Sequence, residues 1–360
     1  MTTPTLRYIP INKGHFELDT LERSAEFQRK LAVGWEKGYE EYRNLWIELP
    51  NKREVRDYPL LVDLELASVC NLNCPMCYTI TDEFKKLVKK GLMDFELFKR
   101  IVDEVVGKVF ALRLSLRGEP TLHPNFLQAI EYAKSRGIKE VSTLTHGGKM
   151  ELNYFKKAAD AGIDWITISI DGIHEVYNNV RAPLTFDDTL RKLEAIWNYK
   201  EKNSLNKPVI KVQGIWPSIR PNPTLYYNTI APYVDLVAYN PLIDYLRNDT
   251  DIVYEENFAC PQLYQRLVIG SDGQAMMCSN DEEGEEIVGD ANRQRIHEIW
   301  HGAKLNRIRS FHDQKDGFKC MEVCKKCYYP RKAIPDEVAV VGDREIRIEN
   351  YINRKQMVGK

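Results

Sequence analysis

The cysteines of this chain fall into two separate groups, and their placement restricts its fold more than any other feature. Cys70, Cys74 and Cys77 lie in one short stretch, none follows before Cys260, and the last of the remaining five is Cys327. The N-terminal residues contain no apolar segment flanked by basic residues, so we expect no signal peptide and a cytoplasmic protein. Because cytoplasmic thiols stay reduced, two compact groups of cysteines predict two metal sites.

The composition is typical of a water-soluble protein. Of the 360 residues, 43% are hydrophobic and 29% are charged, and the formal net charge is −1. This is enough apolar material for a core, and it creates no overall field that would attract nucleic acid or a membrane surface. No run approaches the roughly 20 apolar residues that span a bilayer. We therefore expect neither a membrane nor nucleic acid as a partner.

Short apolar runs alternate with stretches of helical periodicity between residues 61 and 245. The predicted strands are 61–66, 110–116, 140–144, 165–170, 209–215 and 234–239, and the predicted helices are 95–106, 125–135, 152–161 and 187–199. This alternation predicts an α/β fold of parallel β/α units, either an open sheet or a partial barrel. Ligands of such folds gather at the C-terminal ends of the strands.

Three further segments flank this region. Residues 1–60 are predicted as an N-terminal helical extension, with one helix from about 21 to 46 and a break at Pro50. Residues 246–335 form a loop-rich unit that is too small to be stable without a metal. Residues 336–360 are predicted as a charged C-terminal tail with one strand-like stretch at 337–341.

The first cysteine group, Cys70-x3-Cys74-x2-Cys77, follows the first predicted strand directly. Three thiolates in one loop can hold three irons of a [4Fe–4S] cluster and leave the fourth iron free for a substrate-like molecule. Structural zinc is the alternative, but it usually takes four ligands. The triplet favours a cluster and leaves zinc open.

The second group supplies four ligands. Cys260 and Cys278 bracket a predicted hairpin at 267–269 and 274–277, and Cys324 and Cys327 form a C-x2-C pair. Four thiolates suit zinc and a closed [4Fe–4S] cluster equally. Cys320 is left over; it is a small buried hydrophobe, an alternative ligand, or a hydrogen-atom donor beside the substrate.

The order of motifs resembles the radical SAM (S-adenosylmethionine) superfamily. Arg117-Gly118-Glu119-Pro120 is similar to the family's Gly-Gly-Glu-Pro segment, with Arg117 in place of the first glycine, and Thr145-His146-Gly147 stands where relatives show Thr-Asn-Gly. The resemblance implies a partial (β/α)6 barrel over residues 61–245, with a [4Fe–4S] cluster on the cysteine triplet. The SAM-binding residues that it implies are Gly118, Glu119, Thr145, Ser169, Asp171, Arg181 and Gly214.

The second cysteine group resembles the SPASM/twitch extension of this superfamily. It implies a small loop-rich cluster-binding domain and an auxiliary [4Fe–4S] cluster on Cys260, Cys278, Cys324 and Cys327. Because no cysteine follows Cys327, the unit is similar to the shorter, single-cluster twitch form.

The resemblance also implies an activity. Such enzymes cleave SAM reductively to a 5′-deoxyadenosyl radical, which abstracts a substrate hydrogen, and an external flavodoxin or ferredoxin supplies the electron. We expect oxidation (dehydrogenation) or epimerisation of a carbohydrate or aminocyclitol. The alternatives are modification of a ribosomal peptide or protein, and a non-catalytic metal-binding interaction protein. Candidate polar contacts for the substrate are Arg113, Arg117, His146, Tyr239 and Asn240.

Overall fold

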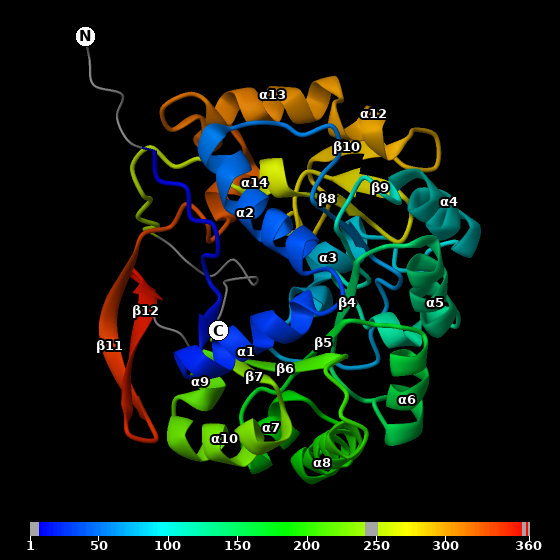
Figure 1. Cartoon of the computed structure of the whole chain (residues 1–360). Coiled ribbons are helices and arrows are strands. Elements are labelled where there is room, and N and C mark those ends of the chain that lie inside the picture. Colours follow the sequence, from blue (N-terminus) through cyan, green and yellow to red (C-terminus); the bar gives the residue numbers. More distant parts are fainter. Residues whose placement is uncertain (1–6, 242–250, 355–357, 359–360) are drawn as a thin grey trace.

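Parallel β-strands form the centre of the computed structural model, which describes residues 7–241, 251–354 and 358. The ten-stranded sheet has the order β1-β7-β6-β5-β4-β3-β2-β8-β9-β10 (Figure 1). Its parallel core consists of β2 (Leu61–Leu64), β3 (Ala111–Arg113), β4 (Glu140–Thr145), β5 (Trp165–Ser169), β6 (Val209–Ile215) and β7 (Leu236–Asn240). The predicted α/β fold with a parallel sheet is therefore confirmed.

Helices connect these strands and cover the outer face of the sheet. They are α4 (Phe95–Val105), α5 (Phe126–Arg136), α6 (Leu152–Asp160), α7 (His174–Val180) and α8 (Phe186–Lys202). Figure 1 shows α4, α5, α6 and α8 following one another along the outer rim. Local sequence sets their ends: the Asp94 side chain accepts from the Leu97 N–H at the start of α4, and Gly137, with φ of 104°, ends α5. These are ordinary cap positions for aspartate and glycine.

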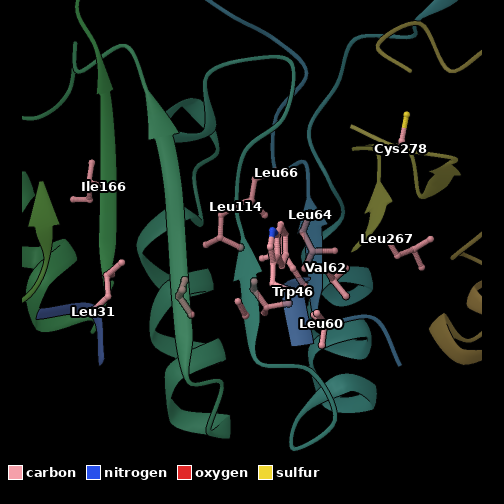
Figure 2. Packing of buried hydrophobic residues seen from close by; sticks show 14 of the residues in the cluster. Leu31, Trp46, Leu60, Val62, Leu64, Leu66, Leu114, Ile166, Leu267 and Cys278 are labelled. Carbon is pink, nitrogen blue, oxygen red and sulfur yellow. The ribbon is translucent and has the colours of Figure 1, made fainter. Parts of the chain in front are cut away.

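Strand β2 has an apolar outer face and a polar inner face. On β2, Val62 and Leu64 pack outward under the helices, whereas Asp63 and the following Glu65 are buried on the inside. Figure 2 shows Val62, Leu64 and Leu114 within the apolar layer. We call the space bordered by the inner faces of β2–β8 the barrel lumen. Its polar lining is the feature of the fold that prepares it for a ligand.

Two N-terminal helices close the bottom of the barrel. The single helix predicted over 21–46 is in fact two, α1 (Leu21–Ala32) and α2 (Glu36–Lys52), because Gly34 adopts φ of 86° between them. The predicted break at Pro50 is also wrong, since this proline lies inside α2. Phe27 packs edge-on against Trp165 at the start of β5, and Tyr42 stacks on Phe110 before β3.

The C-terminal cysteine region continues the main sheet. Strand β8 (Arg266–Ile269) pairs in parallel with β2, and β9 (Gln274–Met276) returns antiparallel to β8 as the predicted hairpin. The remaining elements are β10 (Ile287–Asp290), α11 (Gln262–Gln265), α12 (Ile296–Trp300), α13 (Ala303–His312) and α14 (Glu322–Lys326). The predicted boundary at 245/246 lies outside the described residues.

A hairpin of β11 (Ala333–Val341) and β12 (Arg344–Tyr351) occupies the segment predicted as a tail with one strand-like stretch. The sequence did not indicate β12, because charged residues lie between its apolar residues Ile346 and Ile348 and on either side of them. The hairpin packs near α9 (Trp216–Ile219) and α10 (Pro223–Ile230), with Trp216 donating to Glu337. At the edge of the sheet remote from β10, β1 (Phe16–Glu17) pairs antiparallel with β7. Helix α3 (Asp82–Leu87) follows the first cysteine loop.

Candidate functional site

A pocket of about 1000 Å³ opens at the C-terminal ends of the parallel strands. This is the end at which ligands of such folds bind. Its lining comes from the first cysteine loop and from the segments after β3, β4, β5, β6 and β7. The lining residues are Cys70, Leu72, Cys74, Met76, Cys77, Tyr78, Thr79, Leu116, Arg117, Gly118, Glu119, Leu144, His146, Ser169, Arg181, Ile215, Asn240 and Pro241.

The three cysteines of the first group border this pocket together. All three are free thiols, and Cys70 is exposed while Cys74 is buried. Burial raises the pKa of the Cys74 thiol to about 11, against a smaller opposing effect of Arg181. A thiol in such surroundings ionises readily only when a cation binds it, because the metal charge then replaces the lost hydration. The donor set therefore fits an iron–sulfur cluster with one open iron.

The segment after β3 holds Gly118 and Glu119 against the cysteine loop. The Glu119 N–H donates to the Val69 carbonyl, and a Cβ on Gly118 would lie 2.4 Å from that same oxygen. Glycine is thus required by the close approach of two backbones. The Glu119 carboxylate accepts from the Thr145 hydroxyl and from the His146 N–H. It is already well hydrogen-bonded where it borders the pocket.

His146, which replaces the family's asparagine, faces the pocket with its ring held at both nitrogens. Its Nδ1 accepts from the Gly148 N–H, so its Nε2 carries the proton and lies 2.8 Å from the Asn71 Oδ1. Burial lowers the pKa of His146, and Glu119 partly opposes this. Asn71, inside the cysteine loop, is a site residue that the motifs did not indicate. No sequence pattern marks it, because its partner lies 75 residues away.

Arg181 and Ser169 line the pocket, while Asp171 lies behind them. The Arg181 Nε donates to the Asp171 Oδ2 at 2.7 Å, and the Ile215 N–H donates to the other oxygen. Gly214 is also outside the lining, and a Cβ there would lie 2.4 Å from the Ile170 carbonyl oxygen. Thr145 is likewise outside the lining, where its hydroxyl donates to the Glu119 carboxylate. The structure thus brings four of the seven implied SAM residues to the pocket and places Thr145, Asp171 and Gly214 beneath it.

The candidate substrate contacts separate into different roles. Asn240 and His146 line the pocket, and Arg117 lines it while it is paired with the buried Glu65. Tyr239 points outward, where its ring stacks on Phe16 and contacts the tilted ring of Trp216. It is therefore not a substrate contact. Arg113 lies deeper in the lumen and forms an ion pair with Asp63.

The second cysteine group surrounds a small cavity of about 270 Å³. Cys260, Cys278, Cys324 and Cys327 all line it. Burial raises the pKa of Cys260 to about 12 and that of Cys327 to about 11. Four free thiols converging on one enclosed space, with no disulfide between them, fit a four-ligand iron–sulfur site. His312 lies beside this cavity and was missed by the sequence reasoning.

Cys320 is exposed and lies outside both cavities as the structure describes them. It belongs to the 3₁₀ turn Gly317–Cys320, ahead of the Cys324–Cys327 pair. The proposed roles as a buried hydrophobe and as a hydrogen-atom donor at the pocket both disagree with this position.

Comparison with known protein families agrees with this geometry. Residues 64–206 match the model of the radical SAM superfamily. Residues 260–328 match the SPASM model, an iron–sulfur cluster-binding domain. The chain therefore contains a radical SAM domain followed by a SPASM domain. Its cofactors are therefore SAM and a [4Fe–4S] cluster, with auxiliary cluster binding in the SPASM domain.

Curated relatives match over limited lengths. The tungsten-containing aldehyde ferredoxin oxidoreductase cofactor-modifying protein of Pyrococcus furiosus is 30% identical over 155 residues, 42% of this radical SAM chain and 42% of the relative. The AdoMet-dependent heme synthase of Methanosarcina barkeri is 29% identical over 140 residues, 38% of this chain and 39% of the relative. The alignments thus span less than half of either relative.

Solved structures share the fold over a longer range. BtrN in complex with AdoMet and 2-DOIA superimposes with a TM-score of 0.51 and 16% identity, over 81% of this chain and 98% of BtrN. The AdoMet-bound anSMEcpe gives 0.53 and 17% identity, over 76% of this chain and 91% of that one. At such identities the likeness establishes the radical SAM fold alone. Within the described residues, no helix has the length and apolar character of a membrane span.

Proposed function

We propose that this radical SAM enzyme oxidises a carbohydrate or aminocyclitol, converting a secondary alcohol to a ketone. The observation that carries the proposal is the shared pocket, where the cysteine triplet borders the same space as Ser169, Arg181 and Asn240. Polar side chains such as Thr167 and Ser142 lie on the inward strand faces below this pocket, and they suit a hydroxyl-rich substrate. BtrN, with which the chain shares its fold, was solved with AdoMet and 2-DOIA, and this supports a small-molecule substrate.

Specific residues have distinct tasks in this proposal. When bound, SAM and the cluster on the cysteine triplet supply a 5′-deoxyadenosyl radical that takes hydrogen from carbon. Arg181, oriented by Asp171, offers its guanidinium to the SAM carboxylate, for which its planar fork is suited. Gly118 keeps the chain close enough to the cysteine loop to border the same space.

Oxidation is preferred to epimerisation because of where the thiols lie. An epimerase must return a hydrogen atom to the substrate, and a cysteine beside the pocket is the usual kind of donor. The described residues place no thiol on the pocket apart from the triplet itself, and Cys320 is exposed elsewhere. The net oxidation converts one alcohol and one SAM into one ketone, 5′-deoxyadenosine, methionine and a proton. An external ferredoxin or flavodoxin is therefore needed only to supply the first electron.

The decisive experiment measures products after anaerobic reconstitution with iron and sulfide. The enzyme, SAM and dithionite are incubated in D2O with a panel of hexoses, aminocyclitols and sugar nucleotides, and with synthetic peptides as the competing class. We expect one 5′-deoxyadenosine for each product that is two mass units lighter than its substrate. A product that differs from its substrate only by one deuterium bound to carbon would instead establish epimerisation. A modified peptide would establish the second candidate function, and a Cys74→Ala variant controls for background cleavage.

A further inference from the structure

Charged side chains face the lumen directly below the pocket. Ser169 lines the pocket, and Thr167 precedes it by two residues on the same inward face of β5. Strand register places Lys211 of β6 beside Thr167, so Lys211 also faces inward. Two residues along a strand span about 7 Å. The Lys211 level therefore lies about one sugar ring below the level where SAM is expected.

Two arginines face the same space from the other wall. Arg113 of β3 pairs in register with Ser142 of β4. Ser142 lies two residues before the pocket residue Leu144, on the same inward face of β4. The Arg113 Nε lies 2.7 Å from Asp63, and the Arg266 Nε lies 3.4 Å from the other oxygen of this carboxylate. Both Nε atoms lack a properly aligned hydrogen-bond acceptor among the described residues. One fully buried carboxylate therefore balances two guanidinium groups.

Lys211 adds a third cation, and its ammonium group lies 5.8 Å from the centroid of the Trp165 ring. The described residues place no carboxylate within ion-pair distance of its amine, and Glu17 is the one charge that acts on it from farther away. Glu17 also accepts a hydrogen bond from Ser24 at the barrel edge. Burial lowers the pKa of Lys211 to about 8, so an ammonium group at neutral pH is held there at a cost in stability.

The three cations lie near His15, and solvent reaches this group, since the Arg113 side chain is 30% exposed. The His15 side chain is solvent-accessible, yet its pKa is lowered to about 3, first by burial and then by Lys211, Arg113 and Arg266. Because His15 is neutral at physiological pH, it adds no fourth positive charge beside Lys211, Arg113 and Arg266.

We propose that the lumen is an oxyanion-binding subsite formed by Arg113, Lys211 and Arg266, and that the substrate carries a carboxylate or phosphate group. This inference rests on the proposed function, since it names the substrate class of the same site. The planar guanidinium fork matches either oxyanion, and an ammonium group supplies a point charge. An anionic sugar bound here places a carbon about 7 Å above, at the level of Ser169.

The test is calorimetric titration of the reconstituted full-length protein with SAM present. The probes are glucose 6-phosphate, glucuronate and neutral glucose, and the two anions distinguish phosphate from carboxylate. At least one anion should bind about tenfold or more tightly than glucose, and Lys211→Met should remove this preference. Lys211→Arg, which keeps the charge, should retain it. Equal binding of all three sugars, or an unchanged preference in Lys211→Met, would overturn the proposal.

A second readout separates binding from a structural role. Because burial disfavours the charged form of Lys211, Lys211→Met should raise the urea midpoint of unfolding, and Lys157→Met at an exposed position of α6 serves as the matched control. A lower midpoint in Lys211→Met would mean that this lysine stabilises the folded protein, and it would contradict the proposed subsite. SAM binding by the wild-type protein, titrated without sugar, tests the proposed function separately. If the wild-type protein does not bind SAM, the proposed function is refuted. If it binds SAM but shows no preference for the anionic sugars, only the proposed subsite is refuted.

Discussion

Arg117 and Glu65 form a two-point ion pair at the rim of the pocket. The Arg117 Nε lies 2.7 Å from the Glu65 Oε1, and a second guanidinium nitrogen reaches the other oxygen. The side chains are only 5% and 0% exposed, respectively. Arg117 also donates to the Glu282 carbonyl, so this departure from the family's glycine connects the barrel to the cluster domain.

Removing Arg117 should therefore destabilise the protein strongly. Arg117→Gln leaves the Glu65 carboxylate buried without its cation, and loss of one partner of such a pair costs about 3–5 kcal/mol. Urea unfolding measures the change. The matched control is Arg136→Gln, which breaks the exposed pair with Asp103 and should cost less than about 1 kcal/mol. Equal costs for both variants would contradict the assigned role of Arg117.

Glu140 makes stability depend on pH in a defined direction. Its burial, followed by repulsion from Asp164, raises the pKa of Glu140 to about 7. Between pH 4.5 and 7 the unfolded chain has lost this proton while the folded chain retains it, so this group lowers stability as pH rises. Glu140→Gln should match wild type near pH 4.5 and be more stable by about 3 kcal/mol at pH 8.

Unfolding by urea at pH 5 and pH 8 tests this prediction, with the exposed Glu131→Gln as the control. The diagnostic quantity is the change in the stability difference between the two pH values. A Glu140→Gln difference from wild type that is the same at both pH values would mean that the carboxyl group is ionised throughout.

His312 should tune the C-terminal cluster. The Cys260 N–H donates to its Nδ1, so the ring proton resides on Nε2, 3.9 Å from the Cys324 Sγ. Burial lowers the pKa of His312 to about 4, which keeps the ring neutral. An N–H directed at a ligand sulfur stabilises the reduced cluster, so His312→Leu should lower its reduction potential.

A redox titration followed by electron paramagnetic resonance measures this shift. The N-terminal cluster, which lies in the other cavity, provides an internal reference that should not move. A change of the same size in both clusters would indicate a general distortion and not a hydrogen bond to Cys324.

Loss of one C-terminal ligand should remove one cluster. Cys278 is buried in the second cavity, whereas Cys320 is exposed outside it. Cys278→Ala should reduce iron from about eight to about four atoms per chain after reconstitution, and it should lower the melting temperature. Cys320→Ala is the matched control and should keep the full iron content. Iron lost from Cys320→Ala instead would make Cys320 the ligand.

The sequence by itself determined the parts of this protein that depend on local pattern. Spacing of Cys70, Cys74 and Cys77 after a strand, together with the ordered motifs up to Arg181, was sufficient to predict the superfamily, the parallel α/β fold and the cofactors. Strand and helix periodicity located the β/α units because burial of an apolar face repeats every two residues or every 3.6 residues.

Only the tertiary structure decided which side chains meet. Asp63, Arg113, Lys211 and Arg266 lie on separate strands, and parallel register is what brings them to one lumen. A signal was present in the apolar and polar alternation of residues 61–65, but alternation does not reveal which distant strands are neighbours. Likewise, the exposure of Cys320 and the contact of His312 with Cys324 depend on packing between segments, which no local pattern encodes.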